Sequence, residues 1–139
     1  MKKITVLLAD DNHLVRRDIR ELLELEADLK IVGEASNGVS AVAMAKELRP
    51  ALVLMDVAMP QLNGLQATRE ILKALPDTKV LMISSHDDDV YAEEAANSGA
   101  VGYVLKHTVV NGLCHAIREV HKGKKMFRPK LPLHLHKRK

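Results

Sequence analysis

Four of the five short apolar runs in this sequence are followed closely by residues whose side chains can do chemistry. These residues are three carboxylates, one hydroxyl and one amine: Asp10, Asp11, Asp56, Ser84 and Lys106. Three carboxylates at close range repel one another and resist ionisation unless a cation lies among them. Mg²⁺ is a hard cation that takes one or two carboxylates and shares its other positions with waters and a phosphate. If the runs are neighbouring strands, their ends predict a magnesium site beside a place for phosphate.

Asp56 is the candidate nucleophile of this group, because an aspartate beside Mg²⁺ fits formation of an aspartyl-phosphate. The chain has no Gly-x-x-x-x-Gly-Lys-Ser/Thr or Gly-x-Gly-x-x-Gly loop, which counts against nucleotide binding, and no Gly-x-Ser-x-Gly elbow. Phosphatases with an aspartate nucleophile need a second acid two residues later, where this chain has Ala58. A small Mg²⁺-dependent phosphatase is therefore the weakest hypothesis. The pattern favours a switch that accepts a phosphoryl group and holds it.

Each of these residues also has an ordinary structural explanation. Asp10 and Asp11 could simply begin a helix, where acids interact favourably with the helix dipole. Lys106 could extend to solvent from a strand end, and Ser84 could be a polar strand terminus. We favour the functional interpretation because all of them together at strand ends are much rarer than any one of them.

The apolar runs predict five strands, at 4–8, 30–35, 51–55, 79–83 and 102–105. The first, third and fourth are continuously apolar, which is typical of strands covered on both faces. The segments between them carry apolar residues at helical spacing, most thinly in the fourth helix, at roughly 87–97. Asn12 and Asn37 stand where N-caps belong. Pro50 and Pro76 follow helix ends.

This alternation of strand and helix predicts the fold class. Five repeats imply a parallel sheet with right-handed crossovers and helices on both faces. We therefore expect an α/β protein with a five-stranded parallel sheet, doubly wound as (βα)5. Ligands of such sheets bind beyond the carboxyl ends of the strands, which is where the chemically active residues fall.

Length and composition predict one domain, since 139 residues leave little room for a second. No apolar stretch approaches the ~20 residues needed to cross a bilayer, so we expect no membrane partner. The apolar start is too short for a secretory signal, and the single Cys114 cannot form an internal disulfide. We expect a cytoplasmic protein.

The net charge of +3 is unevenly distributed along the chain. Residues 1–121 hold thirteen Lys and Arg against eighteen Asp and Glu, whereas residues 122–139 hold eight Lys and Arg and no acid. A basic tail supplies only generic attraction to phosphate. With one Phe, two Tyr and no Trp, the chain also lacks a stacking platform for single strands. Composition therefore does not predict nucleic-acid binding by the folded part.

Taken together, these residues resemble the receiver domain of bacterial two-component response regulators. The matching elements, in chain order, are the acid pair Asp10–Asp11, the stretch 56–64 (Asp-Val-Ala-Met-Pro-Gln-Leu-Asn-Gly), Ser84 and Lys106. The resemblance covers about residues 3–122 and implies the flavodoxin-like receiver fold. The stretch continues into Leu65-x-x-Thr68, which is most similar to regulators of the NarL/FixJ (LuxR-type) subfamily.

The resemblance implies a magnesium-dependent phosphoacceptor in phosphorelay signal transduction. Asp56 would take the phosphoryl group from the phosphohistidine of a sensor histidine kinase. Asp11, Asp56 and the backbone carbonyl of Ala58 would ligate Mg²⁺, and Asp10 would act through a water. The implied protein is a signalling phosphoacceptor rather than an enzyme, with only intrinsic self-phosphorylation and self-dephosphorylation.

The resemblance also implies a switch. Ser84 and Lys106 would bind the phosphoryl oxygens, and Tyr103 would change rotamer as Ser84 moves toward the phosphate. A phosphoryl group adds about two negative charges and three strong acceptors, enough to reposition a nearby hydroxyl. The alternative for Tyr103 is a half-buried strand residue. His107 follows Lys106 where many receivers have a cis-proline, and a cis bond without proline costs about 3–4 kcal/mol.

We expect the receiver domain over 1–122 and a basic tail or linker start over 123–139. Regulators with this resemblance normally continue into a helix-turn-helix DNA-binding domain, for which the tail has no room. The main hypothesis is therefore the receiver part of a DNA-binding transcription regulator, which reaches DNA only through an output domain outside this chain. The alternative is a stand-alone receiver that docks on another protein when phosphorylated. A homodimer formed on phosphorylation is implied by the resemblance alone.

Overall fold

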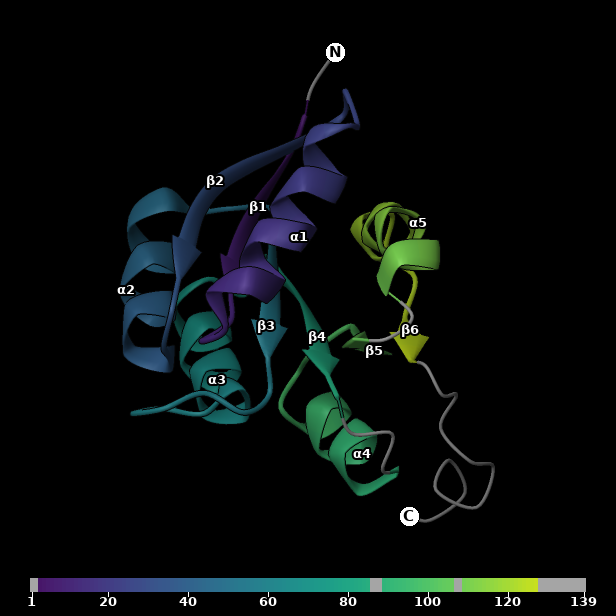
Figure 1. Cartoon of the computed structure of the whole chain (residues 1–139). Helices are drawn as coiled ribbons and strands as arrows, with labels where there is room; N and C mark the ends of the chain where they lie inside the picture. The colour runs from purple at the N-terminus through teal and green to yellow at the C-terminus, as the bar shows by residue number, and fades with distance from the viewer. Residues whose placement is uncertain (1–2, 86–88, 107–108, 128–139) are drawn as a thin grey trace.

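The computed structural model describes residues 3–85, 89–106 and 109–127. These residues form a parallel sheet with helices on both faces and strand order β2-β1-β3-β4-β5-β6 (Figure 1). The elements in chain order are β1 Ile4–Ala9, α1 His13–Glu24, β2 Leu29–Ala35, α2 Gly38–Leu48, β3 Leu52–Asp56, α3 Gly64–Ala74, β4 Lys79–Ser84, α4 Asp89–Asn97, β5 Gly102–Leu105, α5 Val109–His121 and β6 Met126–Phe127. None of the described helices is both long and apolar enough to cross a membrane.

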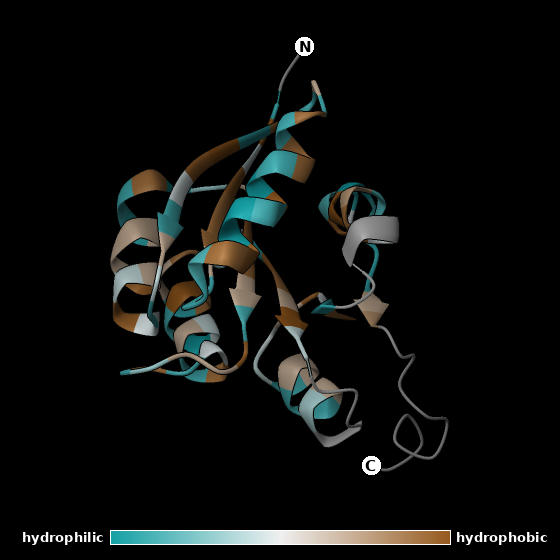
Figure 2. Ribbon diagram, viewed as in Figure 1, coloured by the Kyte–Doolittle hydropathy of each residue, from teal (hydrophilic) through white to brown (hydrophobic). Residues whose placement is uncertain are grey.

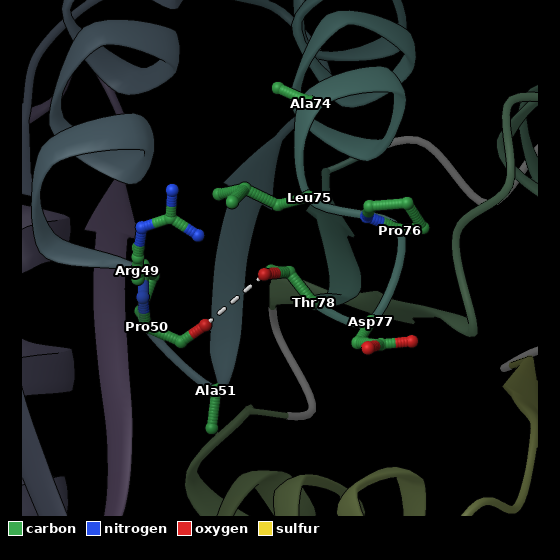
Figure 3. Close-up of a pocket in the computed structure, with 8 residues that line it drawn as sticks. All are labelled: Arg49, Pro50, Ala51, Ala74, Leu75, Pro76, Asp77 and Thr78. Atoms are coloured by element: carbon green, nitrogen blue, oxygen red, sulfur yellow. Dashed lines mark hydrogen bonds between the residues drawn. The ribbon is translucent and has the colours of Figure 1, made fainter.

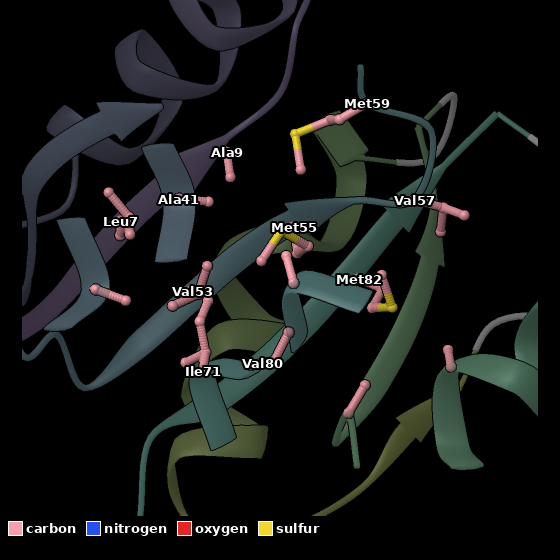
Figure 4. Close-up of a cluster of buried hydrophobic side chains, with 14 of the residues drawn as sticks. Leu7, Ala9, Ala41, Val53, Met55, Val57, Met59, Ile71, Val80 and Met82 are labelled. Carbon is pink, nitrogen blue, oxygen red and sulfur yellow. The ribbon is translucent and has the colours of Figure 1, made fainter. Parts of the chain in front are cut away.

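The sheet buries a separate hydrophobic cluster on each face, because successive side chains of a strand point to opposite sides. Leu8 of β1 joins a cluster with Ile19 of α1 and Ile117 of α5. Its neighbour Leu7 joins the opposite cluster, with Ala41 of α2 and other residues of α3 and α4 (Figure 4). Much of the length of β1 and β4 is accordingly hydrophobic in Figure 2. Burial on both faces explains why these runs are continuously apolar rather than alternating.

The predicted fold class is confirmed, with one short strand added. All five predicted strands are present as β1 to β5, and the two-residue β6 pairs in parallel with β5. A two-residue strand has no detectable periodicity, so local pattern could not predict it. The side chains of Asn12 and Asn37 cap α1 and α2 by accepting hydrogen bonds from backbone N–H groups, as predicted. Helix α4 begins at Asp89, and residues 87–88 of its predicted span lie outside the described residues.

The start of α3 is packed tightly against the end of β3. Asn63 caps α3, and its capping box with Gln66 was not recognised in the sequence. The next residue, Gly64, donates its N–H to the carbonyl oxygen of Val57 at 2.8 Å. A Cβ atom on Gly64 would lie 2.1 Å from the carbonyl oxygen of Asp56. Only glycine fits here without moving the backbone, so this residue sets the path of the loop that follows Asp56.

We predict that Gly64→Ala lowers the free energy of unfolding by about 2 kcal/mol or more, because the added methyl overlaps a backbone oxygen. Gly112→Ala in α5 is the matched control, since a Cβ there meets no atom within 4 Å. That change should raise stability by about 0.5–1 kcal/mol, through reduced entropy of the unfolded chain. Urea denaturation of both variants measures the difference. Equal stabilities for the two variants would contradict the close approach at Gly64.

Candidate functional site

Two adjacent strands bring three carboxylates together. β1 and β3 are neighbours, with Ala9 opposite Met55, so the residues that end them meet at the carboxyl edge of the sheet. Asp56 closes β3, and Asp10 and Asp11 follow β1. One carboxylate oxygen from each of the three lies within 4.8 Å of the others. Asp10 and Asp56 are buried and Asp11 is exposed. The cluster is therefore open to solvent on the side of Asp11.

Lys106 reaches this acidic cluster from two strands away. It follows β5, and β4 lies between β5 and β3 in the sheet. Its Nζ atom lies 3.0 Å from Oδ2 of Asp10 and 3.4 Å from Oδ2 of Asp56. The side chain is only 24% exposed. The amine therefore points into the cluster, and the alternative of a lysine extended to solvent does not describe its position.

Burial and charge change the proton affinities in this cluster. Burial raises the pKa of Asp56 to about 7; repulsion from Asp10 acts in the same direction, and Lys106 opposes both. Burial lowers the pKa of Lys106, but attraction to Asp56 and Asp10 outweighs it and leaves the pKa above its ordinary value. Near neutral pH the Lys106 amine is therefore charged. The Asp56 carboxyl is ionised in part of the molecules and protonated in the rest. Any further cation in the cluster would favour the ionised form of Asp56.

The donor atoms fit a hard divalent cation. Oδ1 of Asp10 accepts the Asn12 N–H at 2.9 Å, and Oδ1 of Asp56 lies 3.4 Å from the Ala58 nitrogen. Oδ2 of Asp10 is buried and lies 3.0 Å from the Lys106 amine. Three carboxylates carry more negative charge than one lysine neutralises. Oxygen-only donors with surplus negative charge suit Mg²⁺ better than softer metals.

The two predicted switch residues lie on the strands next to the cluster. Ser84 ends β4 and is buried. Tyr103 lies in β5 opposite Met82, and its side chain is 0% exposed within the hydrophobic cluster that α2, α3 and α4 cover. The alternative interpretation, a half-buried strand residue, is therefore wrong in its burial, because α4 packs on this face of β5. The proposed coupling between Ser84 and Tyr103 stays a prediction.

Three other parts of the predicted site have different outcomes. Ala58 lies in the exposed part of the loop after β3, and the role of its carbonyl stays a prediction. His107 lies outside the described residues, as do residues 128–139 of the predicted basic tail.

Sequence analysis missed Arg16, whose guanidinium donates to the backbone carbonyl of Asp10. The available signal was its position four residues after the N-cap Asn12, one helical turn from the loop that carries the acid pair.

A pocket of about 310 Å³ lies at the opposite edge of the sheet (Figure 3). Its lining comes from the segments 49–51 and 74–78, which precede β3 and β4. The amino ends of the strands form that edge, so the pocket contains none of the predicted site residues. The acidic cluster at the carboxyl edge is therefore the candidate site.

Comparison with known proteins identifies the family. The family described as the response regulator receiver domain matches residues 6–118. The chain belongs to this family. The receiver domain is 41% identical over 126 residues to the transcriptional regulatory protein YxjL of Bacillus subtilis, covering 91% of this chain and 58% of that protein. It is 38% identical over 128 residues to the response regulator VraR of Staphylococcus aureus, covering 92% of this chain and 61% of that protein.

Solved structures place the receiver domain in the NarL/FixJ type. A LuxR-family response regulator from Aurantimonas superposes with a TM-score of 0.89 at 28% identity, covering 98% of this chain and 97% of that one. The receiver domain named NarL from Mycobacterium tuberculosis gives 0.85 at 32% identity, covering 89% and 100%. The chain spans about three-fifths of the length of the curated relatives named above.

We predict a specific pH dependence of stability for the metal-free receiver domain. The folded state holds a proton on Asp56 up to pH about 7, whereas the unfolded chain releases it near 4. Between these values the folded state binds more protons, so stability falls as pH rises. Asp56→Asn lacks this titration and should gain about 2 kcal/mol relative to wild type between pH 5 and pH 8.

Urea denaturation at both pH values, with a metal chelator present, measures the free energy of unfolding of wild type and Asp56→Asn. Titrating groups that the two proteins share contribute equally to both values, so their contribution cancels in the difference. Added Mg²⁺ should reduce it, because a cation favours the ionised carboxylate. Parallel stability profiles for wild type and Asp56→Asn would contradict the raised pKa.

Proposed function

We propose that Asp56 accepts a phosphoryl group from the phosphohistidine of a sensor histidine kinase in a Mg²⁺-dependent reaction. The observation that carries this proposal is the carboxylate of Asp56 beside Asp10, Asp11 and the Lys106 amine. In the transfer, a carboxylate oxygen of Asp56 forms a bond to phosphorus while the bond from phosphorus to the imidazole nitrogen breaks. The electron pair of that broken bond returns to the imidazole. Ionised Asp56 is the required form, and its pKa of about 7 makes that form available near neutral pH.

The carboxylates would hold the metal beside the reacting oxygen. Asp11, Asp56 and the carbonyl of Ala58 would ligate Mg²⁺, and Asp10 would act through a water. When bound, Mg²⁺ supplies positive charge that offsets the carboxylates and the phosphoryl oxygens. The buried Oδ2 of Asp10 and the exposed position of Asp11 support this assignment, because the cluster has surplus negative charge and an open side.

Lys106 and Ser84 would bind the phosphoryl oxygens. Lys106 already lies within 3.4 Å of the Asp56 carboxylate, so its charge is available to the group that Asp56 receives. Ser84 ends the strand beside β3 and would donate its hydroxyl to a second oxygen. Its movement would change the packing around Tyr103, and this is how the modification would reach α4 and β5.

The proposed output is control of a DNA-binding domain in transcription regulation, since relatives are named transcriptional regulatory proteins. The receiver domain would span 1–122, and 123–139 would begin the linker. The protein would be cytoplasmic, its partner would be a sensor histidine kinase, and phosphorylation would favour a homodimer. The alternative is a stand-alone receiver that acts by docking on another protein. The protein would act as a signalling phosphoacceptor, with only its own phosphorylation and dephosphorylation as chemistry.

We predict that acetyl phosphate with Mg²⁺ adds one phosphate to the wild-type chain and none to Asp56→Asn, as measured by intact mass. Asp77→Asn is the matched control, because Asp77 is an acid at the opposite edge of the sheet. It should take up phosphate as wild type does. A metal chelator should abolish phosphate uptake by wild type and by Asp77→Asn. Equal uptake by wild type and Asp56→Asn would remove Asp56 from its proposed role.

A further inference from the structure

We propose that Arg16, held by Glu34, is a positioning residue that orients the acid pair Asp10–Asp11 for metal binding. The inference rests on the proposed function, because it assigns a role in forming the same magnesium site. Arg16 lies in α1 and Glu34 in β2, and neither belongs to the acidic cluster itself. Arg16 would act on the metal ligands only through the backbone.

The Arg16 guanidinium joins two elements at the edge of the site. Its Nη1 atom donates to the backbone carbonyl oxygen of Asp10, and its Nε atom lies 3.1 Å from Oε1 of Glu34. The side chain is only 17% exposed, so solvent screens these contacts weakly. The guanidinium is planar, permanently charged and has several donors in a fixed arrangement, which allows it to hold both acceptors at once.

The carbonyl that Arg16 binds belongs to the peptide unit between the two acids. A peptide unit is planar, so fixing its carbonyl oxygen also fixes the direction in which the chain continues to Asp11. The Asp10 N–H donates to the carbonyl oxygen of Ala35 at 3.0 Å, and this holds the other side of the residue. Asp11 is exposed, and its carboxylate forms no hydrogen bond or ion pair with a described residue. Its orientation therefore depends on the backbone that Arg16 holds.

Glu34 holds the Arg16 side chain, and Arg20 pairs with the same carboxylate and so provides a control. Glu34 precedes Ala35 in β2, so the strand that accepts the Asp10 N–H also holds Arg16. Arg20 lies one helical turn after Arg16 and pairs with the other carboxylate oxygen of Glu34, at 2.6 Å. Among the hydrogen bonds of the described residues, Arg20 has none to Asp10. The two arginines thus share an anchor, but only one contacts the acid pair.

The test is calorimetric titration of the full chain with Mg²⁺. Arg16→Gln should weaken Mg²⁺ affinity about tenfold, the lower end of what is lost when a residue supporting a metal ligand is removed. Arg16→Lys should also weaken it severalfold, because an ammonium cannot hold both acceptors in the same geometry. Glu34→Gln should act in the same direction as Arg16→Gln but less strongly. Arg20→Gln should change the affinity less than twofold.

Phosphorylation by acetyl phosphate gives a second readout. For Arg16→Gln, the Mg²⁺ concentration at half-maximal rate should rise about tenfold, whereas the maximal rate at saturating Mg²⁺ should stay within twofold of wild type. A merely structural role would lower the maximal rate together with the folded fraction. Thermal unfolding of each variant identifies any loss of fold, and Arg16→Lys and Glu34→Gln serve as the test if Arg16→Gln does not fold.

Wild-type affinity in the folded Arg16 variants would overturn the inference. Equal weakening by Arg16→Gln and Arg20→Gln would overturn it as well, because the effect would then come from attaching α1 to β2. If the wild type binds Mg²⁺ and is phosphorylated in these experiments, only the inference has failed. If the wild type binds no Mg²⁺, the proposed function has failed, and the inference with it.

Discussion

Repulsion among three carboxylates within 4.8 Å of one another is the constraint on which the rest of this structure depends. Two of the three are buried, so water does not screen them fully, and burial is the largest reason why the pKa of Asp56 rises to about 7. One amine, that of Lys106, lies between Asp10 and Asp56 and compensates part of the negative charge. The remaining negative charge would attract a further cation, and the proposed chemistry depends on that attraction.

The parallel sheet is what makes this unfavourable arrangement possible. Residues from sequence positions 10, 56 and 106 meet because β1, β3 and β5 all end at one edge of the sheet. The two hydrophobic clusters that cover its faces stabilise the strands, and their burial offsets the cost of gathering like charges. The tight contact between Gly64 and the carbonyl of Asp56 adds a steric constraint at the same edge. Asp10 and Asp56 therefore lie in the buried part of the site, and Asp11 lies on its open side.

The site is also connected to both faces of the sheet. On one side Tyr103 belongs to the hydrophobic cluster that α4 covers, and the proposed coupling to Ser84 would act through the packing of this cluster. At the other end Arg16 links the acid pair to β2 through Glu34. The proposed coupling through Tyr103 would transmit a change, because a large side chain in a packed core cannot move without displacing its neighbours. The link through Arg16 and Glu34 would resist movement of the backbone, because it consists of hydrogen bonds to a planar, charged group.

Local pattern was enough to predict β1 to β5, the caps Asn12 and Asn37, and the types of residue at the strand ends. These features depend on neighbours in the sequence, where apolar periodicity and capping preferences act. Strand β6, the full burial of Tyr103 and the contact of Arg16 with Asp10 were not predicted. Each depends on segments that meet only after folding. The sequence by itself determined which chemical groups stand at the strand ends, and the tertiary structure alone decided their separations. Charge interactions and proton affinities follow from those distances and from burial, which a linear pattern does not contain.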